Sequence, residues 1–154
     1  DYMGKAAKQV VTYCIRNDIG TLIVGYNTTF QRSSDLGRQM NQVFVGIPFG
    51  ILRRKLKYLC EMNGIRYVEQ EESYTSMASF WDLDEMPVYG EAGLVPPVFS
   101  GRRICRGLYQ DRSGRRINAD VNGALNIMRK CNIVSLRALY DRGDVDTPVR
   151  IRIA

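Results

Sequence analysis

The chain of 154 residues contains no histidine. This absence excludes imidazole as a general base, as the partner of a nucleophilic cysteine and as a metal ligand. Any catalysis would have to use carboxylates, lysine, hydroxyl groups or a hard cation. The sequence also has no run of about 20 apolar residues, which excludes a membrane-spanning helix. Its first residues, Asp1–Lys5, lack the charged-then-apolar pattern of a secretory signal.

Cysteine is scarce as well, and the four residues are scattered. A chain of this length buries roughly 68–70% of its unfolded surface, so it needs no disulfides to fold. Most of the cysteines occupy apolar positions of helical patterns, which indicates buried free thiols in a reducing compartment. They are Cys14, Cys60, Cys105 and Cys131.

Positive charge is missing from one stretch. Between Glu69 and Gly101 there are seven acidic residues and no Lys or Arg, while the rest of the chain holds 22 basic and 9 acidic residues. Arginines follow this stretch at once, with a tyrosine among them. Arginines beside an aromatic side chain suit phosphate contacts and base stacking, although a solvated strand face is the simpler alternative. The candidate nucleic-acid-binding residues are Arg102, Arg103, Arg106, Tyr109, Arg115 and Arg116.

A second basic cluster, Arg53–Lys57, is better explained as the solvated face of a helix. Periodicity and turn residues predict an alternation of helices and strands, and therefore an α/β architecture. We expect helices at 4–17, 48–64 and 119–131, strands at 21–24 and 65–68, an irregular stretch at 70–101, a hairpin of 103–109 with 115–118, and an edge strand at 149–153. Asn118 is the predicted N-cap of the helix over 119–131, whose apolar face would comprise Val121, Ala124, Leu125, Met128 and Cys131.

The segment Asn118-Ala119-Asp120-Val121-Asn122-Gly123-Ala124 resembles the third catalytic motif of the RuvC-type nuclease domain in TnpB (OrfB) proteins. These are transposon-encoded, RNA-guided DNA endonucleases related to type V CRISPR effectors. Other matches follow the same order along the chain. They are Asn41-Gln42, Ile47–Phe49, the Tyr-Thr-Ser segment within 71–76, Ser100–Ile104 and Arg106–Tyr109.

The resemblance implies an RNase H-like core that lacks its first strands. Residues 1–131 would form a partial RuvC-like domain, with an irregular insert at 70–118 and a tail at 132–154. It further implies DNA and guide RNA as partners, together with the missing N-terminal part of the same protein, in a prokaryotic cytoplasm. A nucleic-acid-binding remnant without cleavage activity is the alternative.

The same resemblance implies a Mg²⁺ site. Asp120 would be one ligand, because the first turn of a helix favours an ionised carboxylate. The family's second carboxylate ends a strand, where this chain has Gly25, so Glu71 or Glu72 is the natural substitute. The family's first catalytic Asp has no counterpart. Its zinc ribbon has also lost its cysteines, since only Cys105 falls in that region and a closed zinc site needs four ligands.

Overall fold

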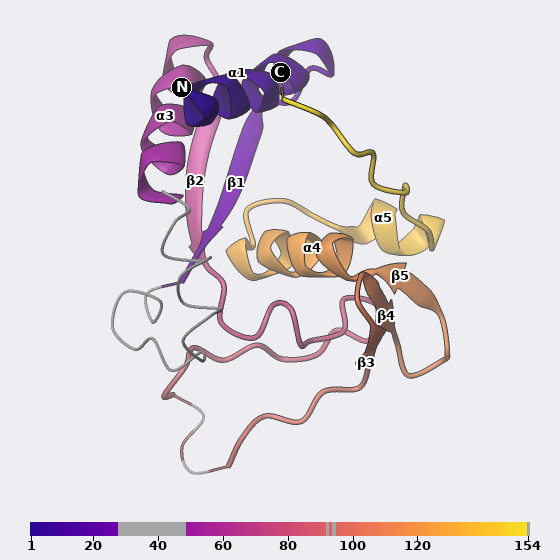
Figure 1. Cartoon of the computed structure of the whole chain (residues 1–154). Coiled ribbons are helices and arrows are strands. Elements are labelled where there is room, and N and C mark those ends of the chain that lie inside the picture. Colours follow the sequence, from indigo (N-terminus) through magenta and orange to yellow (C-terminus); the bar gives the residue numbers. More distant parts are fainter. Residues whose placement is uncertain (28–48, 92, 94, 154) are drawn as a thin grey trace. The chain divides into compact units, whose positions relative to one another are not determined.

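A computed structural model describes residues 1–27, 49–91, 93 and 95–153 (Figure 1). The matched segments Asn41-Gln42 and Ile47-Pro48 lie outside the described residues. The chain divides into two compact units. The first unit comprises Asp1–Glu69 with the last residues from Ile151, and the second comprises Gln70–Arg150.

The first unit alternates helix and strand, as the periodicity predicts. Helix α1 (Tyr2–Arg16) leads to strand β1 (Thr21–Tyr26), and helix α3 (Phe49–Met62) leads to strand β2 (Arg66–Glu71). The backbone N–H of Arg66 donates to the carbonyl of Gly20 at 2.9 Å, so the starts of the two strands lie side by side. The strands therefore run parallel, with α3 as the connection between them (Figure 1).

The core of the first unit is apolar throughout its described residues. Positions one helical turn apart on α1 and α3 face each other and pack over the two strands. The periodicity of the sequence predicts one apolar face of α1 that also includes Val10 and Ile15, but these two residues are 39% and 53% exposed. The buried residues are Ala7, Val11, Cys14, Leu56, Cys60 and Ile65.

The second unit holds a three-stranded antiparallel sheet and two helices. Its strands are β3 (Arg102–Cys105), β4 (Leu108–Gln110) and β5 (Arg116–Asn118), in that order across the sheet. The predicted single hairpin is therefore two hairpins, because a turn at Gly107, with φ of 80°, separates β3 from β4. Helix α4 (Ala119–Cys131) has the predicted bounds, and the described residues of 72–101 contain no helix or strand.

Aromatic residues dominate the core of the second unit. Phe80 stacks on Tyr140 with ring centroids 4.7 Å apart, and the Tyr140 hydroxyl donates to the Phe80 carbonyl at 2.9 Å. Tyr140 comes from helix α5 (Arg137–Arg142), which the weak periodicity of the tail did not predict. The expected edge strand at 149–153 does not form among the described residues. Within the same described part, no helix has the length and apolar character needed to cross a membrane.

Candidate functional site

Asp120 lies in the first turn of α4 with an exposed side chain. The Oδ1 atom of Asn118 accepts from the backbone N–H groups of Asp120 and Val121, at 2.9 and 3.1 Å. This cap satisfies two of the orphan donors at the helix start. The carboxylate of Asp120 is thereby held on a fixed backbone at the positive end of the helix, a position suited to a cation ligand.

The same helix carries a polar stripe, which we define as Asn118, Asn122, Asn126 and Lys130. The four residues are spaced at intervals of four and so lie along one side of α4. Asn122 and Asn126 are both 0% exposed. Their side chains bind the backbone of the Tyr-Thr-Ser segment and the residues that follow it.

Each buried asparagine of the polar stripe makes more than one hydrogen bond. Asn122 accepts from the backbone N–H of Phe80 at 3.1 Å and donates to the carbonyl of Ala78 at 2.9 Å. Asn126 donates to the carbonyls of Thr75 and Ala78, at 3.0 and 2.8 Å. The stripe thus replaces the strand partner that this irregular segment lacks, because buried backbone groups must be paired.

Lys130 ends the polar stripe and binds Glu71. Its Nζ atom lies 2.7 Å from Glu71 Oε2 and also donates to the carbonyls of Ser73 and Pro87. The other carboxylate oxygen of Glu71 accepts from the backbone N–H and the hydroxyl of Ser73. Burial by itself would raise the pKa of Glu71, but the bonds from Lys130 and Ser73 outweigh it, so the net pKa is lowered.

The structure does not bring Asp120 and Glu71 together. Glu71 is bound at residue 130 and Asp120 stands ten residues earlier, so roughly 15 Å of helix separates the two positions at 1.5 Å per residue. Glu72 follows Glu71 directly in the chain and lies in the same region. Among the residues that the structure describes, no three metal-binding side chains form a group.

The stripe also corrects the predicted face of α4. Its buried positions are Ala119, Asn122, Leu125 and Asn126. Of the five apolar residues predicted to line that face, only Leu125 is buried, and Ala124 is exposed. The helix turns its asparagines inward because their amides have backbone partners there. The spacing of the four stripe residues was visible in the sequence and would have been the signal for this face.

A hydrogen-bond network around the carboxylate of Asp84 holds the insert. Asp84, 9% exposed, accepts from the backbone N–H groups of Ser79 and Ser100 at 2.8 and 2.9 Å, and from the Ser100 hydroxyl at 2.6 Å. Arg129 of α4 donates to the backbone carbonyl of Asp84. Hydrogen bonds therefore tie this part of the insert to the start of β3 and to α4.

The predicted nucleic-acid residues separate into two kinds. Within the described part of the chain, the guanidinium groups of Arg102, Arg103, Arg106 and Arg116 have no hydrogen-bond or ion-pair partner. Arg115 differs, because its guanidinium lies 4.6 Å from the centre of the Trp81 ring, 3.7 Å from Asp111 Oδ2 and 3.4 Å from the carbonyl of Gly143. The first four can accept phosphate without breaking an internal contact.

The prediction that Tyr109 stacks on bases is wrong. Tyr109 is 1% exposed and lies in the core of the second unit, where its hydroxyl donates to the carbonyl of Met77 at 2.7 Å. Burial raises its pKa to about 12, and nearby Asp84, Asp82 and Asp111 add to the shift. Gly101 is needed beside it, since a Cβ atom there would lie 2.6 Å from the Tyr109 ring.

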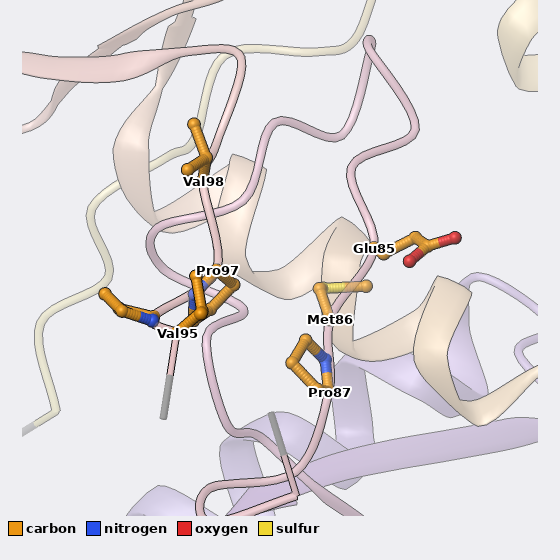
Figure 2. Close-up of a pocket in the computed structure, with 7 residues that line it drawn as sticks. Glu85, Met86, Pro87, Val95, Pro97 and Val98 are labelled. Atoms are coloured by element: carbon orange, nitrogen blue, oxygen red, sulfur yellow. The ribbon is translucent and has the colours of Figure 1, made fainter. Parts of the chain in front are cut away.

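An open groove of about 640 Å³ lies in the insert (Figure 2). Its only charged lining residue is Glu85, and the others are Met, Pro and Val. Such a lining offers a single carboxylate and no positive charge for nucleic acid, so the groove is not part of the candidate site. The remaining lining residues are Met86, Pro87, Val95, Pro96, Pro97 and Val98.

Comparisons with known proteins add a family and a fold. Residues 49–127 match the family model described as Cas12f1-like, TNB domain. A search of curated proteins finds no match. Among solved structures, the chain is similar to one in a cryo-EM structure of the Cas12f1–sgRNA–target DNA complex, with a TM-score of 0.52 and 20% sequence identity. The similarity covers 81% of this chain and 32% of that one, so this chain spans about a third of that protein's length.

Proposed function

We propose that this chain, which belongs to the family of Cas12f1-like TNB domains, acts as part of an RNA-guided DNA endonuclease of the TnpB type. The family confirms the resemblance of its motifs to TnpB proteins and type V effectors. The observation that carries the proposal lies in the second unit. Four arginines without partners among the described residues occupy the small sheet or its turn, and that sheet leads directly into the capped helix α4, which carries Asp120 in its first turn.

The finer fold is also a proposal. The order helix, strand, helix, strand with parallel strands supports an RNase H-like core without its first strands. The three short antiparallel strands and the network around Asp84 support a ribbon-like insert that has lost its cysteines. In this proposal hydrogen bonds hold the insert in place of zinc.

Asp120 is the proposed Mg²⁺ ligand of this chain, because it is an exposed carboxylate at a capped helix start. Asp120, Glu71 and Glu72 do not fit a two-metal site as they stand, since Glu71 is bonded to Lys130 and lies at the other end of α4. We propose that cleavage of a DNA phosphodiester needs further carboxylates supplied outside the described residues, such as the family's first catalytic Asp.

A plasmid assay tests this assignment. We expect the 154-residue chain to produce no nicks with Mg²⁺ or Mn²⁺, because the carboxylates of its described residues do not converge. Nicking that disappears in Asp120→Ala would show a complete site and contradict the proposal. In a longer protein that cleaves DNA, Asp120→Asn should abolish cleavage while guide RNA and DNA binding persist. Glu71→Gln and Glu72→Gln in that protein would identify which glutamate, if either, is the second ligand.

A nucleic-acid-binding remnant without cleavage is the second candidate. The ion pair of Lys130 with Glu71 favours it, because a glutamate held by an ammonium group is a stable structural element without a metal. The two candidates differ in one result. If the chain is a remnant, it binds nucleic acid in a salt-dependent manner. A longer protein that contains it would then still show no Mg²⁺-dependent cleavage.

A further inference from the structure

The strand register places two arginines on the same face of the small sheet. Arg102 on β3 pairs with Gln110 on β4, and Gln110 pairs with Arg116 on β5. Residues directly opposite each other in an antiparallel sheet project from the same face. Arg102, Gln110 and Arg116 therefore form one row across the three strands, which we name the arginine row.

On β4 and β5 the opposite face of the sheet is the buried one, whereas all of β3 is exposed. Tyr109 and Ile117 pair with each other and are 1% and 5% exposed. Because side chains alternate along a strand, Gln110 and Arg116 point away from this core. The arginine row therefore lies on the solvent side, where both of its guanidinium groups are without internal partners among the described residues.

The spacing of the row suits two phosphates. Arg102 and Arg116 stand on the outer strands, two strand spacings or roughly 10 Å apart. Each guanidinium presents a rigid fork of donors that matches a phosphate in a bidentate manner. Gln110 between them adds no charge, and its Nε2 atom donates to the carbonyl of Gly114 at 3.2 Å.

Among the described residues of the three strands, no aromatic ring is exposed on this face. The only aromatic residue in β3, β4 and β5 is Tyr109, whose ring lies in the core. The nearby ring of Trp81 is covered by Arg115, and Phe80 and Tyr140 pack edge-on against it. Single-strand binding by base stacking requires exposed rings, so the face lacks the means for it.

We infer that the arginine row binds the sugar–phosphate backbone of a nucleic acid through two phosphates and does not stack its bases. The inference rests on the proposed function and deepens it by naming the part of the nucleic acid that is bound. It predicts binding that depends on salt and is indifferent to base identity and to the presence of bases.

The test compares the 154-residue chain on two single strands of equal length, oligo(dT) and an oligomer of abasic sites. We expect dissociation constants within about twofold of each other, because both strands offer the same phosphates. The double variant R102Q/R116Q should weaken binding and flatten the log–log salt slope by about 1.4 units, at about 0.7 per phosphate contact on single strands. R137Q/R142Q is the matched control, since it removes the same charge from two arginines that already pair with aspartates.

Three results would contradict either the inference about the arginine row or the proposed function. Tenfold weaker binding to the abasic oligomer would overturn the inference, because bases would then contribute, while leaving the proposed function intact. An equal loss of slope in R102Q/R116Q and R137Q/R142Q would also overturn it, because net charge would explain the binding. If the wild-type chain bound neither oligomer, nor duplex DNA or RNA at low salt, the nucleic-acid part of the proposed function would fail as well.

Discussion

The two units bury different kinds of side chain. The buried residues in the described part of the first unit are Ala, Val, Cys, Leu and Ile, without a polar member. In the second unit, seven polar residues are buried beside an aromatic core. They are Ser73, Thr75, Ser79, Asp84, Asp111, Asn122 and Asn126.

This difference follows from how the buried backbone N–H and C=O groups of each unit find hydrogen-bond partners. The described part of the first unit consists mainly of helices and strands, whose backbone groups bond among themselves, so its buried side chains need only fill space. The second unit contains an irregular segment at 72–101, whose buried backbone groups find partners in side chains of α4 and in Asp84. Polar side chains are thus structural in the second unit and would be costly in the first.

The largest expected effect comes from placing an amide in the apolar core. Leu56→Asn keeps nearly the same size but buries a carboxamide at a position that is 5% exposed and surrounded by apolar groups. The lost apolar burial and the unpaired amide together should lower the free energy of unfolding by about 3–6 kcal/mol. Urea unfolding followed by far-UV circular dichroism measures this loss.

Leu59→Asn is the control on the same helix, because Leu59 is only partly buried. Its amide can reach water, so a smaller loss is expected. Equal losses for the two variants would show that helix propensity, and not burial, sets the cost.

The reciprocal change in the second unit should cost somewhat less. Asn122→Leu removes the hydrogen-bond partner of the Phe80 N–H and one of the two partners of the Ala78 carbonyl. The Ala78 carbonyl keeps its bond from Asn126, whereas the Phe80 N–H loses its Asn122 acceptor. Each unsatisfied buried group costs about 1–3 kcal/mol, partly offset by the added apolar side chain, so a loss of about 2–4 kcal/mol is expected. Fluorescence of Trp81, the only tryptophan, follows unfolding of this unit.

Asn132→Leu gives a comparison at the exposed end of the same helix. The side chain of Asn132 makes no hydrogen bond within the described part of the chain. Its φ of 52° favours asparagine, so leucine at this position should lower the free energy of unfolding by about a few tenths of a kcal/mol or more. Should Asn122→Leu be as stable as the wild type, the polar stripe would not be what holds the irregular segment.

This contrast explains what the sequence could predict. Apolar residues one helical turn apart predicted α1 and α3 and the buried positions of α1, although Val10 and Ile15 of the same predicted face are exposed. The cap at Asn118 and the bounds of α4 also follow from local chemistry. The inward face of α4 does not, because Asn122 and Asn126 are buried only through partners some 40–50 residues away in the chain.

The candidate site likewise contains residues that a local sequence signal predicts and residues whose role depends on distant contacts. Asp120 and its motif were recognisable from one short segment, and the free arginines from their number. The pairing of Glu71 with Lys130 spans 59 positions, and the inward turn of Tyr109 depends on Gly101. Such contacts have no local signal, so the sequence predicted Glu71 or Glu72 as the second metal ligand and Tyr109 as a nucleic-acid-binding residue.

The ion pair of Lys130 with Glu71 should produce a smaller, pH-dependent effect. The pKa of Glu71 is lowered in the folded state, so the pair's stabilisation is present above the pKa of the unfolded chain and is lost as the pH falls through the folded value. We expect Lys130→Met to lose about 1–3 kcal/mol near neutral pH, as for hydrogen bonds to charged groups. Its stability should decline less steeply than that of the wild type from pH 5 to pH 3.

Arg137→Met is the control, because Arg137 pairs with Asp141 at the surface. The side chains of Arg137 and Asp141 are 88% and 72% exposed. Because water screens such a pair, it contributes little to stability, so the stability of Arg137→Met should depend on pH as that of the wild type does. Parallel acid profiles for Lys130→Met and the wild type would show that the low pKa of Glu71 does not arise from Lys130.

The smallest effect should separate two adjacent arginines. Arg115 lies over the Trp81 ring and near Asp111, whereas the side chain of Arg116 has no partner among the described residues. Arg115→Gln should cost about 0.5–1 kcal/mol through the lost cation–π contact and change the emission of Trp81. Arg116→Gln should leave the free energy of unfolding within about 0.5 kcal/mol of the wild type, yet weaken binding to nucleic acid. If instead Arg115→Gln weakens binding and Arg116→Gln lowers stability, internal contacts do not distinguish the arginines that hold the fold from those that meet phosphate.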